Sequence, residues 1–263
     1  MPEPLPISVL LLARDEAREL GTLLPALAFA AEVVVVWDPR GTPATRDTAA
    51  RLGARVCEHA FAGFGAQRRF ALAQCRQPWV LWIDADERPD LGLVAALRAG
   101  LAPGGVADAG VAGLRIVRRT WFLGRRIRFC GWRDERIVRA FRREAASFDD
   151  APVHERVTVT GAIADVAGTI EHRSYETIEA CVTKMQRYAR AGAEAAHARG
   201  RRAGVLDLLL RPPLRFARQY MLQLGVLDGT HGLVLCGFAA AQVFLKYATL
   251  WDLGRRGGKD AAP

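Results

Sequence analysis

The chain has 263 residues, of which 51% are hydrophobic and 25% are charged. This composition suits one large globular domain, or one domain with an appended segment, and excludes disordered and fibrous proteins. The net charge of +9 is carried almost wholly by arginine, since only three of the 37 basic residues are lysine, and indicates an anionic partner such as a nucleotide, a nucleic acid or a membrane surface.

The N-terminal residues lack the basic region and small-residue cleavage site of a signal peptide. The first apolar run, 7–13, is too short to span a bilayer. Five scattered cysteines, with no CxxC spacing, are typical of reduced thiols rather than of disulfides or zinc ligands. We therefore expect a cytoplasmic protein.

Short apolar runs alternate with helical patterns through the first hundred residues. The expected strands cover residues 7–12, 32–37, 54–58 and 79–83, and the expected helices cover 16–31, 45–52, 65–75 and 90–101. Continuously apolar strands separated by helices indicate a mostly parallel sheet covered on both faces, as in a doubly wound α/β domain. Ligands bind at the carboxyl ends of such strands, so the loops after Leu12, Trp37 and Ile83 should share one edge.

The pattern changes after residue 101. A stretch rich in glycine, proline and alanine, 102–113, precedes a strand over 114–117, and a helical pattern returns over 176–199. Beyond residue 204 the sequence predicts apolar segments broken by Pro212-Pro213 and by Asp228-Gly229.

The C-terminal region combines apolar and basic residues. Its apolar run over 233–245 has 13 residues, fewer than the roughly 20 of a spanning helix. Arg211, Arg215 and Arg218 alternate with apolar and aromatic residues, a pattern that suits the surface of an anionic membrane. A helical pair packed on the catalytic domain and a dimer interface are the alternatives.

The most informative motif is Asp84-Ala85-Asp86, at the end of the predicted strand 79–83. Carboxylates two residues apart on an extended chain point to the same side. Mg²⁺ and Mn²⁺ commonly bridge one or two carboxylates to substrate phosphates, and such a cation neutralises a departing diphosphate. A solvated strand end is the alternative.

Three further features lie at the same expected edge. Asp38 follows the second strand and is suited to accept hydrogen bonds from a base or ribose, or to act as an ordinary turn residue. Glu16 follows the first strand, where a first-turn carboxylate is common. The glycine-rich turn over 63–69 is a weak indication of a phosphate-facing helix start.

With these motifs in place, the chain resembles family 2 glycosyltransferases of the GT-A fold, in particular the lipopolysaccharide-core glucosyltransferase type. The resemblance runs almost end to end and includes the strings Asp84–Arg88, Phe122–Arg125, Gly131-Trp132, Arg139–Arg143, Val153-His154-Glu155, Glu171–Tyr175, Gly225–Gly229 and Phe244–Ala248. It implies a mixed, mostly parallel sheet with helices on both faces and a C-terminal helical extension. The implied domains are a catalytic domain over 1–175 (nucleotide half 1–101, acceptor half 113–175) and a helical region over 176–263.

The resemblance also implies an inverting, metal-dependent transfer with roles for individual residues. Nucleotide-sugar contacts fall on Glu16, Asp38, Arg68 and Asp84. The Mg²⁺ or Mn²⁺ ligands are expected among Asp86, Asp84 and His154, although a structural histidine is an equal alternative for His154. The general base for in-line displacement is sought among Glu135, Asp134 and Glu155. Arg139 and Arg142 are expected to pair with phosphates or to solvate a strand.

The implied partners are a nucleotide-sugar donor, with a UDP-sugar as first expectation, and a lipid-linked or lipopolysaccharide acceptor, but no nucleic acid. Peripheral contact with the inner face of the cytoplasmic membrane follows from such an acceptor. In the loop after the second strand, Pro43 replaces an acid that is usual in the family, a change that bears on donor identity. The alternative functions are another phosphate enzyme, such as a nucleotidyltransferase, and a non-catalytic basic protein that binds membrane surfaces.

Overall fold

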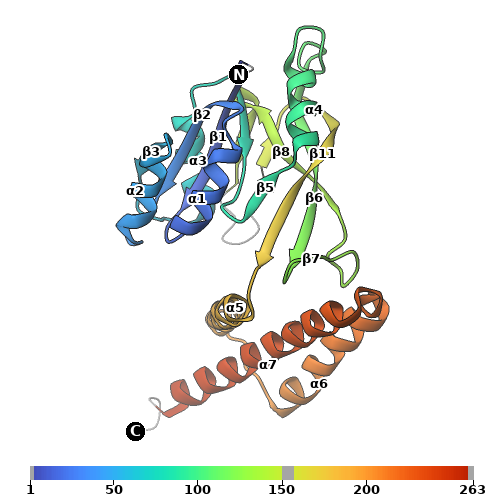
Figure 1. Ribbon diagram of the computed structural model, residues 1–263. Helices are drawn as coiled ribbons and strands as arrows, with labels where there is room; N and C mark the ends of the chain where they lie inside the picture. The colour runs from blue at the N-terminus through green and yellow to red at the C-terminus, as the bar shows by residue number, and fades with distance from the viewer. Residues whose placement is uncertain (1–2, 150–156, 260–263) are drawn as a thin grey trace. The chain divides into compact units, whose positions relative to one another are not determined.

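The computed structural model describes residues 3–149 and 157–259, and the chain forms two compact units (Figure 1). The first unit comprises the chain up to Arg118 together with Glu135–His172, and it contains most of the sheet. The second comprises Arg119–Asp134 and the chain from Arg173 onward. Residues 119–134 therefore group with the C-terminal helices, and the functional division at residue 175 stays a prediction.

The sheet is mixed, as expected, with a parallel half and an antiparallel half. Its strand order is β3-β2-β1-β4-β8-β6-β11-β5, and β7 pairs with β6. The parallel strands are β1 (Leu5–Ala13), β2 (Ala30–Trp37), β3 (Arg55–Glu58) and β4 (Trp79–Trp82). The remaining strands are β5 (Glu87–Pro89), β6 (Val111–Phe122), β7 (Arg125–Arg126), β8 (Glu135–Arg142) and β11 (Ala162–Tyr175). A short 3-10 turn, Arg143–Ala145, leads to a separate antiparallel pair, β9 (Ala146–Phe148) and β10 (Val157–Val159).

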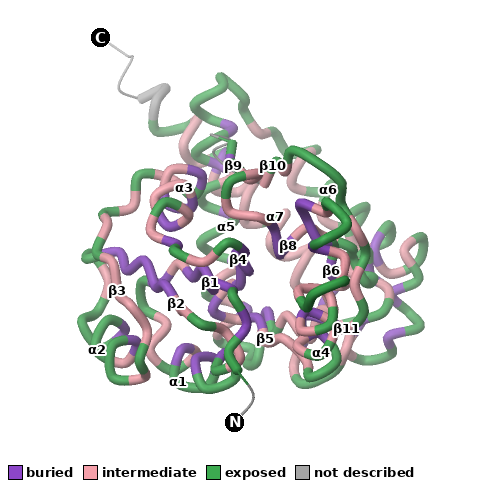
Figure 2. Tube along the Cα trace, turned by 90° about the horizontal axis from the view of Figure 1, so that it is seen from above, coloured by how far each residue is buried: buried purple, intermediate pink, exposed green. Residues whose placement is uncertain are grey.

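Helices cover both faces of the parallel strands because successive strand residues point to opposite sides. Val9 and Leu11 of β1 pack in one core with α1 (Ala17–Ala26), α2 (Pro43–Arg51) and α4 (Leu91–Leu101). The intervening Leu10 packs in a second core with α3 (Phe64–Gln74). Figure 2 shows the resulting buried residues along β1, β2 and β4. The predicted doubly covered α/β sheet is confirmed.

The antiparallel pairings of the other half place later segments beside the end of β4. β8 pairs with β4, and β6 pairs with β8, with Arg118 opposite Glu135. β11 pairs with β5, so that His172 lies opposite Glu87. These registers bring Arg118, Arg139 and His172 close to the segment that follows β4, although the three residues are far apart in the sequence.

The second unit is built from three long helices joined by short turns. They are α5 (Ile178–Ala198), α6 (Val205–Ala217) and α7 (Gly229–Lys259), with a π-helical turn at Arg218–Leu222 and a 3-10 turn at Gly225–Asp228. Small residues of α5, including Ala193 and Ala196, allow close packing with Leu250 of α7. The buried carboxylate of Asp228 accepts the backbone N–H groups of Arg128 (3.1 Å) and Phe129 (2.9 Å), which anchors the segment 119–134 to the helical turn.

Two C-terminal expectations are wrong. Pro212 and Pro213 do not end α6, because the helix packs against α7 and the partly buried Phe216 contacts the core of the unit. The apolar helix is also longer than thirteen residues, because it continues past Leu245. Within the helical segment Gly225–Arg256, a stretch of 18 residues has a mean hydropathy of 1.6. By length and composition the segment could cross a membrane, a criterion that core helices of soluble proteins also meet.

Candidate active site

The acidic motif lies in the turn between β4 and β5, at the carboxyl edge of the parallel strands. All four residues of β4 are buried, which fixes the backbone that leads into Asp84 and Asp86. The pairing of β5 with β11 then sets His172 beside the motif. The Nε2 atom of His172 lies 3.5 Å from Oδ2 of Asp86, and both side chains are partly exposed. Asp86 and His172 thus form a solvent-accessible pair of metal-ligating groups.

Asp84 is held by cations and by an indole. Its Oδ2 accepts a hydrogen bond from Nη2 of Arg139 (3.1 Å), and its Oδ1 accepts from Nη1 of Arg68 (3.4 Å) and from Nε1 of Trp82 (3.0 Å). Burial alone would raise the pKa of this carboxyl, but the charges of Arg139 and Arg68 outweigh burial and lower it. Asp84 is therefore ionised and already neutralised by arginine.

Glu87 lies fully buried behind Asp84. Its Oε1 accepts a 2.6 Å hydrogen bond from Nη2 of Arg139, and its Oε2 accepts the backbone N–H of Asp84 (3.0 Å). Burial raises the pKa of Glu87; the charge of Arg139 opposes this shift, and the charge of Asp84 adds to it. Arg139 and Glu87 are buried and Asp84 is 35% exposed, and the three form one network in which Arg139 serves two carboxylates.

The ring of Trp82 supports this network. The guanidinium carbon of Arg68 lies 3.7 Å from the ring centroid, and that of Arg139 lies 4.1 Å from it. Cation–π attraction is strongest where the cation is shielded from water. Trp82 therefore fixes both arginines that hold Asp84.

The loops after β1 and β2 are tied together at the same edge. The buried carboxylate of Asp38 accepts hydrogen bonds from Nε and from Nη2 of Arg40, the second at 2.7 Å. These hydrogen bonds lower the pKa of Asp38 to about 2. Asp15 accepts the N–H of Thr42 (2.7 Å). A Cβ at Gly41 would lie 2.2 Å from the carbonyl oxygen of Arg14, so only glycine allows this close approach.

Glu16 is the residue that precedes α1, and its side chain folds back on its own loop. Its Oε2 accepts the backbone N–H groups of Arg14 (2.5 Å) and Asp15 (2.9 Å). The structure thus places Glu16 and Asp38 in the two loops that follow neighbouring parallel strands, β1 and β2.

The structure describes two of the three candidate bases. The exposed Glu135 accepts a 2.8 Å hydrogen bond from Nη2 of Arg118, and Nη1 of Arg118 also lies 3.9 Å from Oε1 of Glu87. Asp134 belongs to the second unit, where it pairs with Arg126 at 2.6 Å. His154 and Glu155 lie outside the described residues.

Two contributors to this site, Glu87 and His172, were not predicted from the sequence, and a third, Arg139, was expected in another role. Glu87 and His172 occur in the strings that carry the resemblance, but only the register of β11 on β5 shows that they meet the acidic motif. Arg139 was considered for phosphates or for a solvated strand, and it is instead buried between Asp84 and Glu87. Arg142 bonds the backbone carbonyl groups of Val111 (3.1 Å) and Ala107 (2.5 Å), which is a structural role.

The donor set at the edge suits a hard divalent cation that shares its ligands with a substrate. The part of the chain that the structure describes holds no group of three or more His, Cys, Asp or Glu side chains arranged to bind a metal ion. Asp86 supplies a carboxylate, and Mg²⁺ or Mn²⁺ is commonly bound by one or two carboxylates plus substrate phosphates, while His172 adds an imidazole beside it. The residues present therefore fit such an ion.

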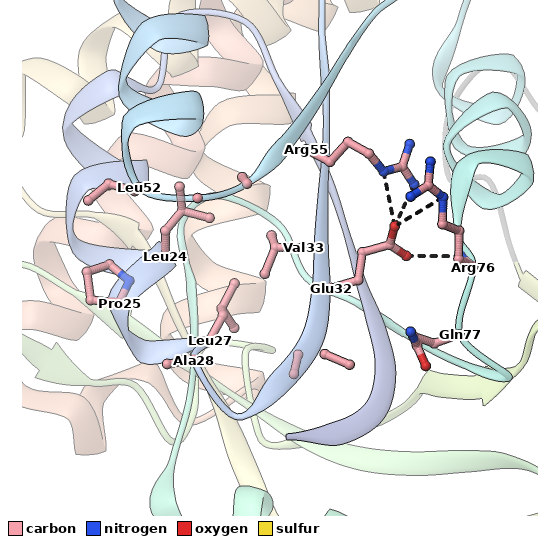
Figure 3. Close-up of a pocket in the computed structure, with 14 residues that line it drawn as sticks. Leu24, Pro25, Leu27, Ala28, Glu32, Val33, Leu52, Arg55, Arg76 and Gln77 are labelled. Carbon is pink, nitrogen blue, oxygen red and sulfur yellow. Dashed lines mark hydrogen bonds and ion pairs between the residues drawn. The ribbon is translucent and has the colours of Figure 1, made fainter. Parts of the chain in front are cut away.

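A pocket of about 500 Å³ lies away from this site, at the amino ends of β2 and β3 (Figure 3). Leu24, Leu27 and Leu52 form its apolar wall, and Glu32 lies on its polar side. Glu32 accepts a 2.7 Å hydrogen bond from Nη2 of Arg55, so its charge is already paired. In parallel sheets substrates bind at the opposite, carboxyl edge. We therefore locate the candidate active site at Asp84–Glu87 and not in this pocket.

Comparison with known proteins adds independent information. The model for "Glycosyl transferase family 2" matches residues 8–157. The chain is 28% identical over 257 residues to the lipopolysaccharide core biosynthesis glycosyltransferase LpsC of Rhizobium meliloti, covering 93% of this chain and 94% of the relative. It is 33% identical over 81 residues to an uncharacterized glycosyltransferase of Rickettsia bellii, covering 31% and 28% of the two chains.

The chain is also similar in structure to solved proteins. The mannosyltransferase PcManGT of Pyrobaculum calidifontis, in complex with GDP-Man and Mn²⁺, aligns at a TM-score of 0.49 and 15% identity, covering 96% of this chain and 90% of that chain. The S. aureus protein TarS (residues 1–349) aligns at a TM-score of 0.43 and 16% identity, covering 95% and 91%.

Proposed function

The chain belongs to glycosyl transferase family 2 and is a glycosyltransferase, and we propose that it moves a sugar from a nucleotide donor to a lipopolysaccharide-core or other lipid-linked acceptor with a divalent cation. The observation that carries the metal-dependent part is the pairing of Asp86 with His172 at the carboxyl edge of the parallel strands. The acceptor class is supported by the end-to-end similarity to LpsC.

Asp86 and His172 are the residues that would hold Mg²⁺ or Mn²⁺. When bound, the cation neutralises charge on the diphosphate leaving group. Asp84, whose oxygens are engaged by Arg139 and Arg68, orients the turn and keeps its backbone N–H on Glu87. The buried network thus positions Asp86 without supplying the ligand itself, and Asp84 remains a candidate donor contact through its exposed part.

The nucleoside would lie against the first two loops. The carboxylate of Asp38 accepts hydrogen bonds only, which suits a base that presents an N–H group, such as uracil. Arg40 holds this carboxylate ionised and fixed, and Glu16 lies in the neighbouring loop. We therefore propose a UDP-sugar as the donor.

Inversion at the anomeric carbon needs one general base that takes the proton from the acceptor hydroxyl. Of the three candidates, Glu135 is the described residue in the same compact unit as Asp86. Its partner Arg118 also reaches Glu87 of the buried network. We propose Glu135 as the base, with Asp134 and Glu155 as the alternatives, and we place the reaction at the inner face of the cytoplasmic membrane, where a lipid-linked acceptor is available.

The function is tested by offering the purified protein individual UDP-, GDP-, ADP- and CMP-sugars with Mn²⁺, with Mg²⁺ or with EDTA. Ligand binding raises the apparent melting temperature by mass action, so the correct donor should stand out in a thermal-shift screen. The expected result is Mn²⁺-dependent stabilisation by a UDP-sugar and metal-dependent release of UDP. Release at the same rate in EDTA would contradict the metal assignment, and stabilisation by another nucleotide alone would contradict the donor assignment.

A further inference from the structure

The second unit carries an exposed apolar surface on α6 and the turns that follow it. Several of its leucine side chains are more than half exposed, and Leu222 reaches 80%. We call it the α6 surface, and it consists of Val205, Leu206, Leu209, Leu210, Leu214, Met221, Leu222, Leu224, Val226 and Leu227. In the described part of the first unit the exposed large apolar side chains are only Phe64, Leu91 and Ile163, so the α6 surface is a concentrated feature. Contiguous apolar patches of this kind usually mark an interaction site.

The helix α6 is apolar on two faces, and its own unit covers one of them. At about 100° per residue, the exposed side chains of Leu206, Leu209, Leu210 and Leu214 lie between about 40° and 180° from Val205. The half-buried Leu208, Pro212 and Phe216 form the other stripe, between about 300° and 20°. Phe216 packs in the core that contains Leu235 of α7. Asp207, Arg211 and Arg215 occupy the remaining sector of the helix, so the exposed leucines form an apolar stripe that its own unit does not cover. The second face of α6 therefore requires a partner.

The charges that border this surface are positive. Arg201, Arg202, Arg215 and Arg218 are exposed, and no ion pair is recorded for any of them within the described chain. The two acids of the same stretch already have partners. Asp207 accepts a 2.5 Å hydrogen bond from Nε of Arg211, and the buried Asp228 accepts hydrogen bonds from backbone N–H groups. The partner must therefore be apolar inside and negatively charged at its boundary.

We propose that the α6 surface docks on an anionic lipid bilayer, with the leucines in the acyl boundary and the arginines on lipid phosphates. An interfacial helix of this type gains from buried apolar area and from attraction to anionic headgroups. A second copy of the chain is a poorer occupant, because a two-fold contact would set the same arginine-rich borders against each other. The inference deepens the proposed function, which places the acceptor in a membrane.

Flotation of the purified full-length protein with lipid vesicles tests the proposal. Vesicles of phosphatidylglycerol and phosphatidylethanolamine are compared with vesicles of phosphatidylcholine, at low and at high salt. We expect binding to the anionic vesicles that high salt weakens. The variant Leu206→Glu/Leu210→Glu/Leu214→Glu should bind about a thousandfold less, since each of the three buried leucines contributes about a tenfold preference. The variant Arg215→Glu/Arg218→Glu should bind about tenfold less.

Leu91→Glu is the matched control, because Leu91 is 89% exposed and lies in the first unit. It should bind vesicles as the unchanged protein does. Equal binding by the triple variant, or absence of the unchanged protein from the anionic vesicle fraction, would overturn the proposal. So would a dimer in sedimentation equilibrium that the triple variant converts to a monomer while vesicle binding stays the same.

Metal-dependent UDP release from the donor, measured on the same preparations without vesicles, separates this inference from the proposed function. We expect the triple variant to release UDP at the unchanged rate, because its substitutions lie in the second unit. UDP release without vesicle binding would overturn the docking surface and leave the function standing. Vesicle binding without UDP release from any donor would overturn the proposed function and leave the docking surface standing.

Discussion

In the first unit, charged side chains are buried against one another at the end of β4, whereas in the second, apolar side chains lie exposed along α6. Arg139 is 3% exposed and shared by two carboxylates, while Leu206 is 71% exposed. Both arrangements cost free energy in an isolated protein unless another interaction offsets it. The first unit supplies that interaction internally through ion pairing. The second leaves it to a partner, which suggests that chemistry and attachment reside in different parts of the chain.

The largest effect that would sharpen this comparison is on catalysis. Asp86→Asn keeps the shape of the side chain but removes the charge that we assign to the cation. We expect UDP release to fall by about a hundredfold or more, because a metal ion contributes several kcal/mol to stabilising the transition state. Asp47→Asn is the matched control, since Asp47 is an exposed acid on α2. Equal rates for the two variants would remove Asp86 from the site.

The next effect is on stability and concerns the buried network. Arg139→Met leaves Asp84 and Glu87 without their shared cation, and breaking a buried pair in this way costs about 3–5 kcal/mol. Urea unfolding should show this loss. Adding Glu87→Gln should recover part of it, because one of the two buried charges is then gone. Arg136→Met is the control, as Arg136 is an exposed residue of the same strand. Equal losses in Arg139→Met and Arg136→Met would show that the network is not a buried one.

A smaller effect is expected at the proposed metal ligand from β11. His172→Ala should weaken Mn²⁺ binding by at least about 10- to 100-fold, because losing even a group that only orients a ligand costs this much. Arg173→Ala, the change at the next and exposed residue, should leave it unchanged. Mn²⁺ affinity is measured by electron paramagnetic resonance in the presence of UDP. If both variants bind Mn²⁺ as tightly as the unchanged protein, His172 is not a ligand.

The smallest effect concerns the pH dependence of the nucleotide loops. The folded-state pKa of Asp38 is about 2, below the ordinary value of 3.8, because Arg40 hydrogen-bonds the ionised form. This pair therefore stabilises the folded protein above pH 3.8, and the contribution is lost as the pH falls toward 2. Arg40→Ala should raise the pKa of Asp38 toward 3.8 and flatten that part of the pH profile. NMR titration of the Asp38 carboxyl measures it, and an unchanged pKa would contradict the assigned cause.

The parallel half of the fold was predictable because each of its strands is a continuous apolar run. The runs ending at Leu12, Trp37 and Ile83 placed Glu16, Asp38 and the acidic motif at one edge from the sequence alone. Arg139 and His172 could not be placed there, because antiparallel register depends on contacts between distant segments rather than on local pattern. The helix through Pro212 and Pro213 was missed for a similar reason, since packing along α7 overrides the local preference of proline.

The central claim is that Asp86 and His172 hold a cation beside a carboxylate network that arginine has already neutralised. A crystal structure of the protein with Mn²⁺ and the UDP-sugar identified by thermal shift tests it most directly. We predict Mn²⁺ bound by an Oδ atom of Asp86, by Nε2 of His172 and by diphosphate oxygens, with Arg139 still on Asp84 and Glu87. Mn²⁺ and diphosphate bound elsewhere, with Asp86 turned away from both, would contradict the claim.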